Sequence, residues 1–248
     1  MVLYFTGTGG SRYIANKLAE STEDTSVSLN TRIKKSDTSA LFSEKPFVFV
    51  TPTYAWDIPR TVREHIMNTE FGGSNKAYFV MTCGTDTGGA QARLKKLCAQ
   101  KKLVFMGLYS IVMPENYIAM FKVPDEQSSR KIIRNAEPKI QNAAELINRG
   151  ECFPKHIGTP LSALKSSVFN SMFCGIFVSD KKFRVKKSCV GCGRCERLCP
   201  VNNIKMVGAQ PFWNGKCIHC MACISSCPQK AIEYGNASVD KNRFYLDE

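Results

Sequence analysis

Uninterrupted apolar runs recur in the N-terminal half of the chain, and each ends in a polar or glycine-rich stretch. The runs cover residues 2–5, 47–51, 77–82 and 103–113, and residues 27–29 can supply one further short strand. Short runs that are apolar at nearly every position are typical of strands buried on both faces. The pattern therefore predicts a sheet with both faces covered.

Helical spacing follows these runs. Apolar residues three or four positions apart predict helices with one buried face. The residues expected to face the core are Ile14, Ala15, Leu18 and Ala19; Val62 and Ile66; Leu94, Leu97 and Cys98; and Ile132, Ala136, Ile140, Ala143 and Ile147. Pro59 suits the first turn of a helix, and Pro138 is expected to bend the last one. Strands that alternate with helices predict an α/β fold with a doubly wound parallel sheet.

A glycine-rich stretch, Thr6-Gly-Thr-Gly-Gly-Ser11, joins the first strand to the first helix. Glycines let the backbone fold around an anion, and N–H groups at a helix N-terminus can donate to it together with the Thr6, Thr8 and Ser11 hydroxyls. The stretch is neither a Walker A motif nor G-x-G-x-x-G, because it lacks the closing Gly-Lys-Ser/Thr and the third glycine. It predicts a phosphate site, with an ordinary glycine-rich turn as the alternative.

The same stretch resembles the phosphate loop of flavodoxins, T-x-T-G-x-T, with Ser11 in place of the last threonine. The resemblance spans residues 1–150 and implies a flavodoxin-like fold that binds FMN at the carboxyl ends of its strands. Loops 52–57 and 82–88 would flank the flavin ring, with Tyr54 or Trp56 stacked on it; a surface aromatic is the alternative for both. The implied FMN-binding residues are Thr6, Gly7, Thr8, Gly9, Gly10 and Ser11; Pro52, Thr53, Tyr54, Ala55 and Trp56; and Thr82, Cys83, Gly84 and Thr85.

Two cysteine runs near the end of the chain repeat each other. The first has Cys189, Cys192, Cys195, Cys199 and Pro200, and the second has Cys217, Cys220, Cys223, Cys227 and Pro228. Each is C-x₂-C-x₂-C-x₃-C-P, the bacterial iron–sulfur spacing in which the fourth cysteine ligates the other cluster. The spacing predicts two [4Fe–4S] clusters. Cluster I would be held by Cys189, Cys192, Cys195 and Cys227, and cluster II by Cys199, Cys217, Cys220 and Cys223.

Zinc is the main alternative, since C-x₂-C pairs also suit a tetrahedral Zn²⁺ site. Zinc would use two cysteines from each run and leave the third cysteine and the Cys-Pro without a role. A disulfide framework is disfavoured because nothing in the sequence suggests export. Residues 183–235 resemble bacterial two-cluster ferredoxins, which implies a small α+β domain at the end of the chain.

The remaining cysteines and the histidines form no ligand spacing. They are Cys83, Cys98, Cys152 and Cys174, with His65, His156 and His219. Cys83 is interpreted as a small filler residue in its loop, and the other three cysteines as core thiols. His219 lies inside a cluster loop, where it could tune the cluster, but we expect it to be solvated.

The sequence divides into three expected parts. These are a flavodoxin-like FMN-binding domain at 1–150, a connecting segment at 151–182, and a ferredoxin-like domain with a C-terminal tail at 183–248. Thr159-Pro160 opens a predicted helix whose apolar face, from Leu161 to Ile176, would pack between the domains. The segment 113–118 would either close over the flavin or form a plain surface connection.

Length and charge narrow the possible partners. A chain of 248 residues, 44% of them hydrophobic, can bury the cores of one medium and one small domain. The formal net charge is +13, and two clusters with a flavin phosphate would lower it to about +7. Residues 181–248 hold 12 Lys and Arg against 5 Asp and Glu. A solvated face that offsets cluster charge is the plain interpretation, a redox protein with an acidic surface is the functional one, and nucleic acid is disfavoured.

The sequence shows no apolar stretch of membrane-spanning length and no basic region of a signal peptide before residues 1–5. Twelve cysteines, eight of them predicted ligands, suit a reducing cytoplasm. A cytoplasmic protein in an anaerobic setting is therefore expected, and a homo-oligomer is allowed.

The whole chain resembles flavodoxin–ferredoxin fusions, the family called EFR1-type ferredoxins. The resemblance implies electron transfer between FMN and two [4Fe–4S] clusters, in a carrier that interconverts one- and two-electron steps. One alternative is an FMN-dependent reductase of a small acceptor, such as a quinone, nitro compound or flavin, fed by ferredoxin-type electrons. A second is a redox-sensing iron–sulfur module that docks through its basic face.

Overall fold

The predicted parallel sheet is present in the computed structural model, which describes residues 1–155 and 178–247. Five parallel strands lie in the order β2-β1-β4-β6-β7. Their bounds are β1 Val2–Tyr4, β2 Ser26–Ser28, β4 Phe47–Pro52, β6 Lys76–Cys83 and β7 Val104–Val112. This is the strand order of flavodoxin-like folds, so the doubly wound architecture expected from the sequence is confirmed.

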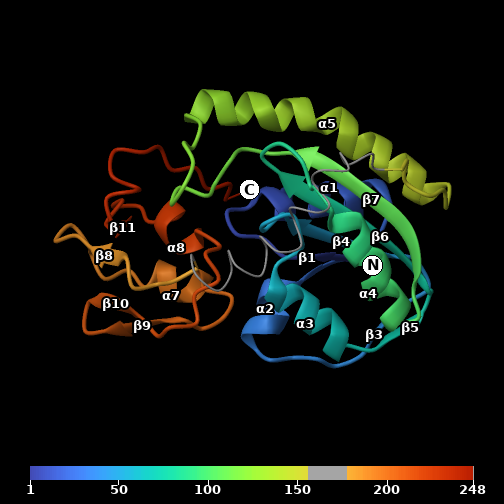
Figure 1. Ribbon diagram of the computed structural model, residues 1–248, viewed down its shortest axis with the longest axis horizontal. Coiled ribbons are helices and arrows are strands. Elements are labelled where there is room, and N and C mark those ends of the chain that lie inside the picture. Colours follow the sequence, from blue (N-terminus) through green and yellow to red (C-terminus); the bar gives the residue numbers. More distant parts are fainter. Residues whose placement is uncertain (156–177, 248) are drawn as a thin grey trace.

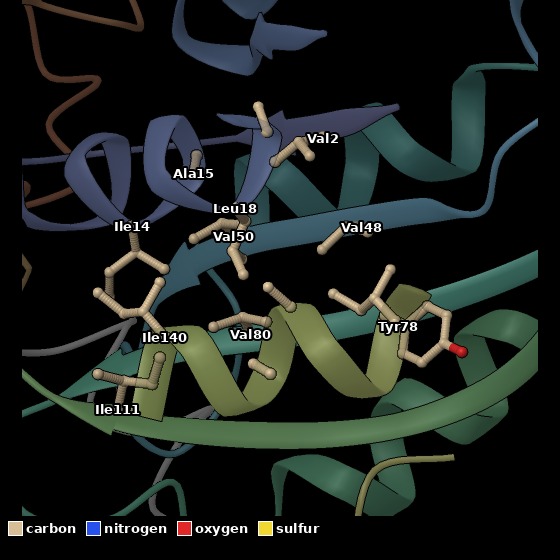
Figure 2. Close-up of a cluster of buried hydrophobic side chains, with 14 of the residues drawn as sticks. Val2, Ile14, Ala15, Leu18, Val48, Val50, Tyr78, Val80, Ile111 and Ile140 are labelled. Atoms are coloured by element: carbon tan, nitrogen blue, oxygen red, sulfur yellow. The ribbon is translucent and has the colours of Figure 1, made fainter. Parts of the chain in front are cut away.

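Side chains alternate across the sheet, so each central strand contributes to two cores. Val48 and Val80 join one core, whereas their neighbours Phe49 and Phe79 join the other. Helices α1 Gly10–Ser21 and α5 Glu126–Asn148 cover the first core, and α2 Leu29–Lys34, α3 Arg60–Asn68 and α4 Ala90–Gln100 cover the second. Figure 2 shows the first core, where side chains of α1 and α5 meet over the strands.

Helix α5 differs in register from the prediction. Ile133 is buried and Ile132 is only half-buried, because the core stripe passes one position further along the chain than expected. Asp125 caps the helix, and its carboxylate accepts the N–H of Ser128 at 2.7 Å. That bond lowers the pKa of Asp125. The helix continues through Pro138 to Asn148.

Two short strands were not predicted. β3 Leu41–Ser43 and β5 Phe71–Gly73 pair in parallel as a separate two-stranded unit. The Phe71 ring packs edge-on against Phe47 and Phe49 of β4. Each strand has only three residues, which is too short for a periodic signal in the sequence.

The C-terminal part is a small α+β unit built on two antiparallel strand pairs. β8 Phe183–Val185 pairs with β11 Ile232–Tyr234, and β9 Ile204–Val207 pairs with β10 Gln210–Trp213. The helices α7 Arg194–Leu198 and α8 Ala222–Ser225 begin within the two cysteine runs. Its apolar core also includes Ile118 and Val123, which come from the segment after β7.

The two parts lie side by side, with the C-terminal end of the chain between them (Figure 1). Lys34 Nζ donates to the carbonyl oxygens of Glu196 and Arg197 at 2.9 and 2.6 Å, and Asn202 Nδ2 donates to Lys34 O at 2.7 Å. Phe244 packs against the cores of both parts. These contacts fix how the two parts are placed.

Some sequence predictions concern residues outside the described ones. The helix predicted from Leu161 to Ile176 is among them, as are His156 and Cys174. Within the part of the chain that the structure describes, no helix combines the length and apolarity needed to cross a membrane.

Candidate functional site

The stretch between β1 and α1 forms a tight, buried loop at the carboxyl end of the sheet. Thr6 Oγ1 accepts the N–H of Gly9 at 2.9 Å, which closes the turn. Asn30 holds Thr6 from both sides, since its Oδ1 accepts from Thr6 N and its Nδ2 donates to Thr6 O, each at 2.8 Å. The side chains of Thr8 and Ser11 are also buried. The loop is therefore shaped by the chain itself, partly through Asn30, which the sequence did not single out.

Helix α1 begins directly after this loop. Its first helical bond runs from Tyr13 N to Gly9 O at 2.9 Å, so the N–H groups of residues 10–12 have no acceptor inside the helix. Such groups attract an anion together with the positive end of the helix dipole. A phosphate group is the ligand that this donor set suits.

The loops after β4 and β6 lie beside the phosphate loop and against each other. Thr53 N donates to Thr82 O at 2.8 Å, and the hydroxyl oxygens of Ser11 and Thr82 are 3.1 Å apart. Trp56 lies over Gly88, where an added Cβ would be 2.3 Å from Trp56 Cδ1. Within the described residues, the buried Thr53 hydroxyl has no hydrogen-bond partner. The structure thus brings the three predicted stretches to one place.

The segment 113–118 covers this place. Glu115 Oε2 lies 2.6 Å from where a Cβ on Gly84 would be, and Asn116 Nδ2 donates to Thr8 Oγ1 at 2.7 Å. Beneath it Cys83 is buried, and burial raises the pKa of its thiol to about 11. The segment contacts two of the three predicted loops, and Cys83 is an inert filler as expected.

The phosphate loop also touches the second cysteine run. A Cβ on Gly7 would lie 2.4 Å from the carbonyl oxygen of Cys220 and 3.3 Å from the Tyr54 hydroxyl oxygen. Burial, and then the nearby Cys220 and Cys217, raise the pKa of Tyr54 well above its ordinary value. Tyr54 therefore lies where the phosphate loop and the second cysteine run meet.

The eight cysteines of the two runs surround two hollows. One hollow, of about 320 Å³, is lined by Cys199, Cys217, Cys220 and Cys223. The other, of about 370 Å³, is lined by Cys189, Cys192, Cys195 and Cys227. The inward face of the β9–β10 hairpin lines both, through Ile204 and Trp213 at the first hollow and Met206 and Pro211 at the second. Each hollow gathers three cysteines of one run and the fourth cysteine of the other.

Backbone N–H groups point at several of these sulfur atoms. The bonds run from Asn203 N to Cys199 Sγ at 3.2 Å, from Ala231 N to Cys227 Sγ at 3.3 Å, and from His219 N to Cys217 Sγ at 3.4 Å. The first two occupy the same place in the two repeats. Donation of this kind stabilises negative charge on a ligand sulfur and tunes the potential of an iron–sulfur cluster.

Burial raises the pKa of the inner thiols in their free form. The pKa of Cys195 rises to about 11 and that of Cys220 to about 12, and Cys223 is raised further. These thiols are therefore protonated at neutral pH, and a metal that binds them displaces protons. Within residues 1–155 and 178–247, no three His, Cys, Asp or Glu side chains converge on a single metal ion.

Two residue-level expectations are wrong. Cys152 is exposed rather than a core thiol, because it follows the end of α5. His219 is buried rather than solvated: its Nδ1 lies 2.9 Å from the Tyr117 hydroxyl oxygen, and its Nε2 accepts the N–H of Ser179 at 3.0 Å. Burial lowers the pKa of His219. Its partners are distant in sequence, so no local pattern could have shown its burial.

The C-terminal tail is the largest component that the sequence did not indicate. Leu246 N donates to Thr8 O at 2.9 Å, and the Arg12 guanidinium donates to Leu246 O at 2.6 Å. Asp247 pairs with Arg194, which lies inside the first cysteine run. The tail thus links the phosphate loop to that run. No residue type or spacing at 244–247 marks it.

Comparison with known proteins agrees with this division of the chain. Residues 188–232 match the family described as 4Fe-4S dicluster domain. A 55-residue stretch is 40% identical to a component of the ion-translocating oxidoreductase complex of Methanosarcina acetivorans, which is 22% of this chain and 21% of that protein. The chain therefore matches only about a fifth of that relative's length.

Solved structures resemble the N-terminal part at low identity. The flavodiiron core of Flv1 from Synechocystis sp. PCC6803 covers 60% of this chain and 36% of its own, at 13% identity and a TM-score of 0.38. The two-electron reduced flavodoxin of Megasphaera elsdenii covers 58% and 97%, at 14% identity and a TM-score of 0.35. An azoreductase of Bacillus anthracis covers 60% and 98%, at 12% identity and a TM-score of 0.34.

The strand order and the dicluster match together define the class of protein. The chain combines a flavodoxin-like α/β part with a C-terminal 4Fe–4S dicluster domain. This architecture supports a role in electron transfer.

Proposed function

We propose that this chain is an EFR1-type flavodoxin–ferredoxin fusion that transfers electrons between FMN and two [4Fe–4S] clusters. When bound, the flavin supplies two-electron chemistry and each cluster supplies one-electron chemistry. Cys189, Cys192, Cys195 and Cys227 would hold cluster I, and Cys199, Cys217, Cys220 and Cys223 would hold cluster II. The domain boundaries 1–150, 151–182 and 183–248 and the cytoplasmic location stay predictions.

The two hollows support this ligand assignment. Each is lined by the four cysteines that the crossed spacing predicts, with apolar side chains completing the walls. A cube needs a thiolate at each of four corners, and a dry apolar lining with N–H donors to sulfur is the environment in which such clusters are held.

The residues at the carboxyl end of the sheet fit FMN. The phosphate loop and the first turn of α1 supply donors for a phosphate group. The buried Thr53 hydroxyl, without a partner among the described residues, is a ready donor or acceptor for a polar group of the ring. We propose the fifteen residues named from the sequence as the FMN contacts, with Asn30 and Asn116 holding the loops in place.

The observation that carries the proposal is the contact between Gly7 and Cys220. The carbonyl oxygen of Cys220 approaches so closely that only a glycine fits opposite it. A candidate ligand of cluster II therefore touches the candidate phosphate loop directly, without an intervening element. We infer that cluster II is the cluster adjacent to the flavin site and that cluster I is the outer one.

Two ligand variants test the proposal. The wild-type protein, purified without oxygen, should hold flavin and about eight iron and eight sulfide per chain. Cys199→Ser should remove cluster II and Cys227→Ser cluster I, each leaving about four iron and a different electron paramagnetic resonance signal. Flavin and cluster absorbance should bleach together on titration with a small reductant in wild type, and this coupling should be lost more completely in Cys199→Ser.

Three outcomes would count against the proposal. A colourless protein, or one that carries zinc in place of iron, would remove the clusters. Flavin and clusters that take up electrons independently would leave the fold intact and remove the transfer. Equal loss of coupling in both variants would contradict the assignment of cluster II as the inner cluster.

A further inference from the structure

The cluster I hollow lies at the surface of the ferredoxin part. Cys192 is exposed, and Val190 in the same loop is 63% exposed. By contrast Cys220, which lines the cluster II hollow, packs its main chain against Gly7 of the sheet part. One hollow therefore faces the rest of the chain and the other faces outward.

Exposed apolar side chains lie next to this opening. Val207 and Phe212 of the β9–β10 hairpin are 61% and 53% exposed. Because Lys205 pairs with Phe212 in the ladder, Val207 and Phe212 are diagonal neighbours on one face of the hairpin. The tip of that hairpin touches the cluster I loop, since a Cβ on Gly191 would lie 3.1 Å from Ala209.

Val190, Val207 and Phe212 are defined here as the apolar ridge. Three of the ten large hydrophobic residues that are exposed in the described chain thus belong to one part of the surface. The hairpin lies on the side of the ferredoxin part away from the parallel sheet (Figure 1).

Positive charge surrounds the ridge. Residues 178–247 hold 12 Lys and Arg and 5 Asp and Glu, a net charge of +7. Two bound clusters would lower this to about +3. Lys187 precedes the cluster I loop and Lys230 follows Cys227, and the two segments are joined by the bond from Lys186 N to Ala231 O at 2.8 Å. Both lysines are exposed.

We infer that the apolar ridge, with Lys187 and Lys230 beside it, is the docking surface for a one-electron redox protein with an acidic face. The inference rests on the proposed function, since it takes cluster I as the outer cluster. The charge favours an acidic partner, and an exposed apolar centre with a charged rim is the usual composition of such an interface. One electron crosses per encounter: the partner's iron–sulfur centre is oxidised by one electron as cluster I is reduced by one.

The experiment measures binding of a purified bacterial two-cluster ferredoxin with net negative charge. The probe is kept oxidised, so that its dissociation constant is obtained without turnover. Lys187→Glu with Lys230→Glu should weaken binding about tenfold at low salt and reduce its salt dependence. Phe212→Ser should also weaken binding, with the salt dependence unchanged.

Each variant has a matched control on the sheet part. Lys95→Glu with Lys96→Glu makes the same change of charge on exposed residues of α4, and Phe42→Ser removes another exposed aromatic ring. Both controls should bind as wild type does. Iron content verifies that every variant carries its clusters.

A small reductant distinguishes failure of this inference from failure of the proposed function. Reduced methyl viologen needs no docking surface, so flavin and clusters should equilibrate in all five proteins if the proposed function holds. If they equilibrate but the α4 control weakens ferredoxin binding as much as the Lys187 and Lys230 pair, the docking site is overturned. It is also overturned if wild type does not bind, or if Phe212→Ser instead breaks a dimer of this chain or abolishes binding to anionic lipid vesicles.

Discussion

Close backbone approach, rather than turn geometry alone, explains the glycines of the phosphate loop. Gly7 faces the carbonyl oxygen of Cys220, and Gly9, at a φ of 97°, would place a Cβ 2.0 Å from the carbonyl oxygen of Leu246. In the sequence both glycines are attributed to an anion. In the folded chain they also let the cysteine-rich part and the tail reach the loop.

Gly7→Ala is predicted to destabilise the protein, while Gly10→Ala serves as its control. The Gly7 Cβ would meet a backbone atom at 2.4 Å, so the cluster II loop must move away. Overpacking of this kind costs about 1–3 kcal/mol. At Gly10 the nearest atom is the flexible Met113 Cε at 3.3 Å, and alanine favours the helix. Thermal unfolding should show a lower midpoint for Gly7→Ala only; equal midpoints would contradict the close contact.

The C-terminal tail acts as an element although it has no regular structure. Arg243 forms a buried ion pair with Glu233, Lys241 donates to the carbonyls of Ile118 and Phe121, and Leu246 bonds to the phosphate loop. It therefore holds three separate segments together. Its last residues depend on contacts with the sheet part, whereas Arg243 is anchored in the ferredoxin part.

Removal of residues 244–248 is predicted to loosen the phosphate loop without unfolding either part. The truncation deletes the Leu246 bonds and the Phe244 packing but keeps the Arg243–Glu233 pair. Hydrogen exchange should become faster in residues 6–12 while β4 and β6 stay protected. Leu246→Pro, which removes only the N–H donor, should give a smaller change in the same residues. Unchanged exchange in the loop would show that the tail does not stabilise it.

At the scale of the whole molecule, the two parts are stabilised in different ways. The sheet part has two apolar cores, and its longest strand has nine residues. The ferredoxin part has strands of three or four residues and cysteines at its centre. A unit of this size rarely folds on apolar burial alone and depends on bound metal.

Removal of iron is therefore predicted to unfold one part before the other. After oxidation and chelation, amides of β8 to β11 should lose protection from hydrogen exchange, while those of β4 and β6 keep it. Reconstitution with iron and sulfide should restore the protection. A metal-free protein with full protection throughout would mean that the apolar core of the ferredoxin part is sufficient.

The sequence by itself determined the local features. Apolar runs and helical spacing gave the five strands and four of the helices, because burial on both faces leaves a periodic record in the chain. The two cysteine runs predicted which four cysteines would share each site, since that pairing follows from spacing. Short elements such as β3 and β5 left no such record.

Only the tertiary structure decided which local features meet. It placed Cys220 against Gly7, buried His219 under Tyr117, and brought Leu246 to the phosphate loop from the other end of the chain. These contacts join residues that are 100 or more positions apart, so no window of sequence contains both partners. The physical reason is that packing depends on the positions of whole elements in space, which periodicity along the chain does not encode.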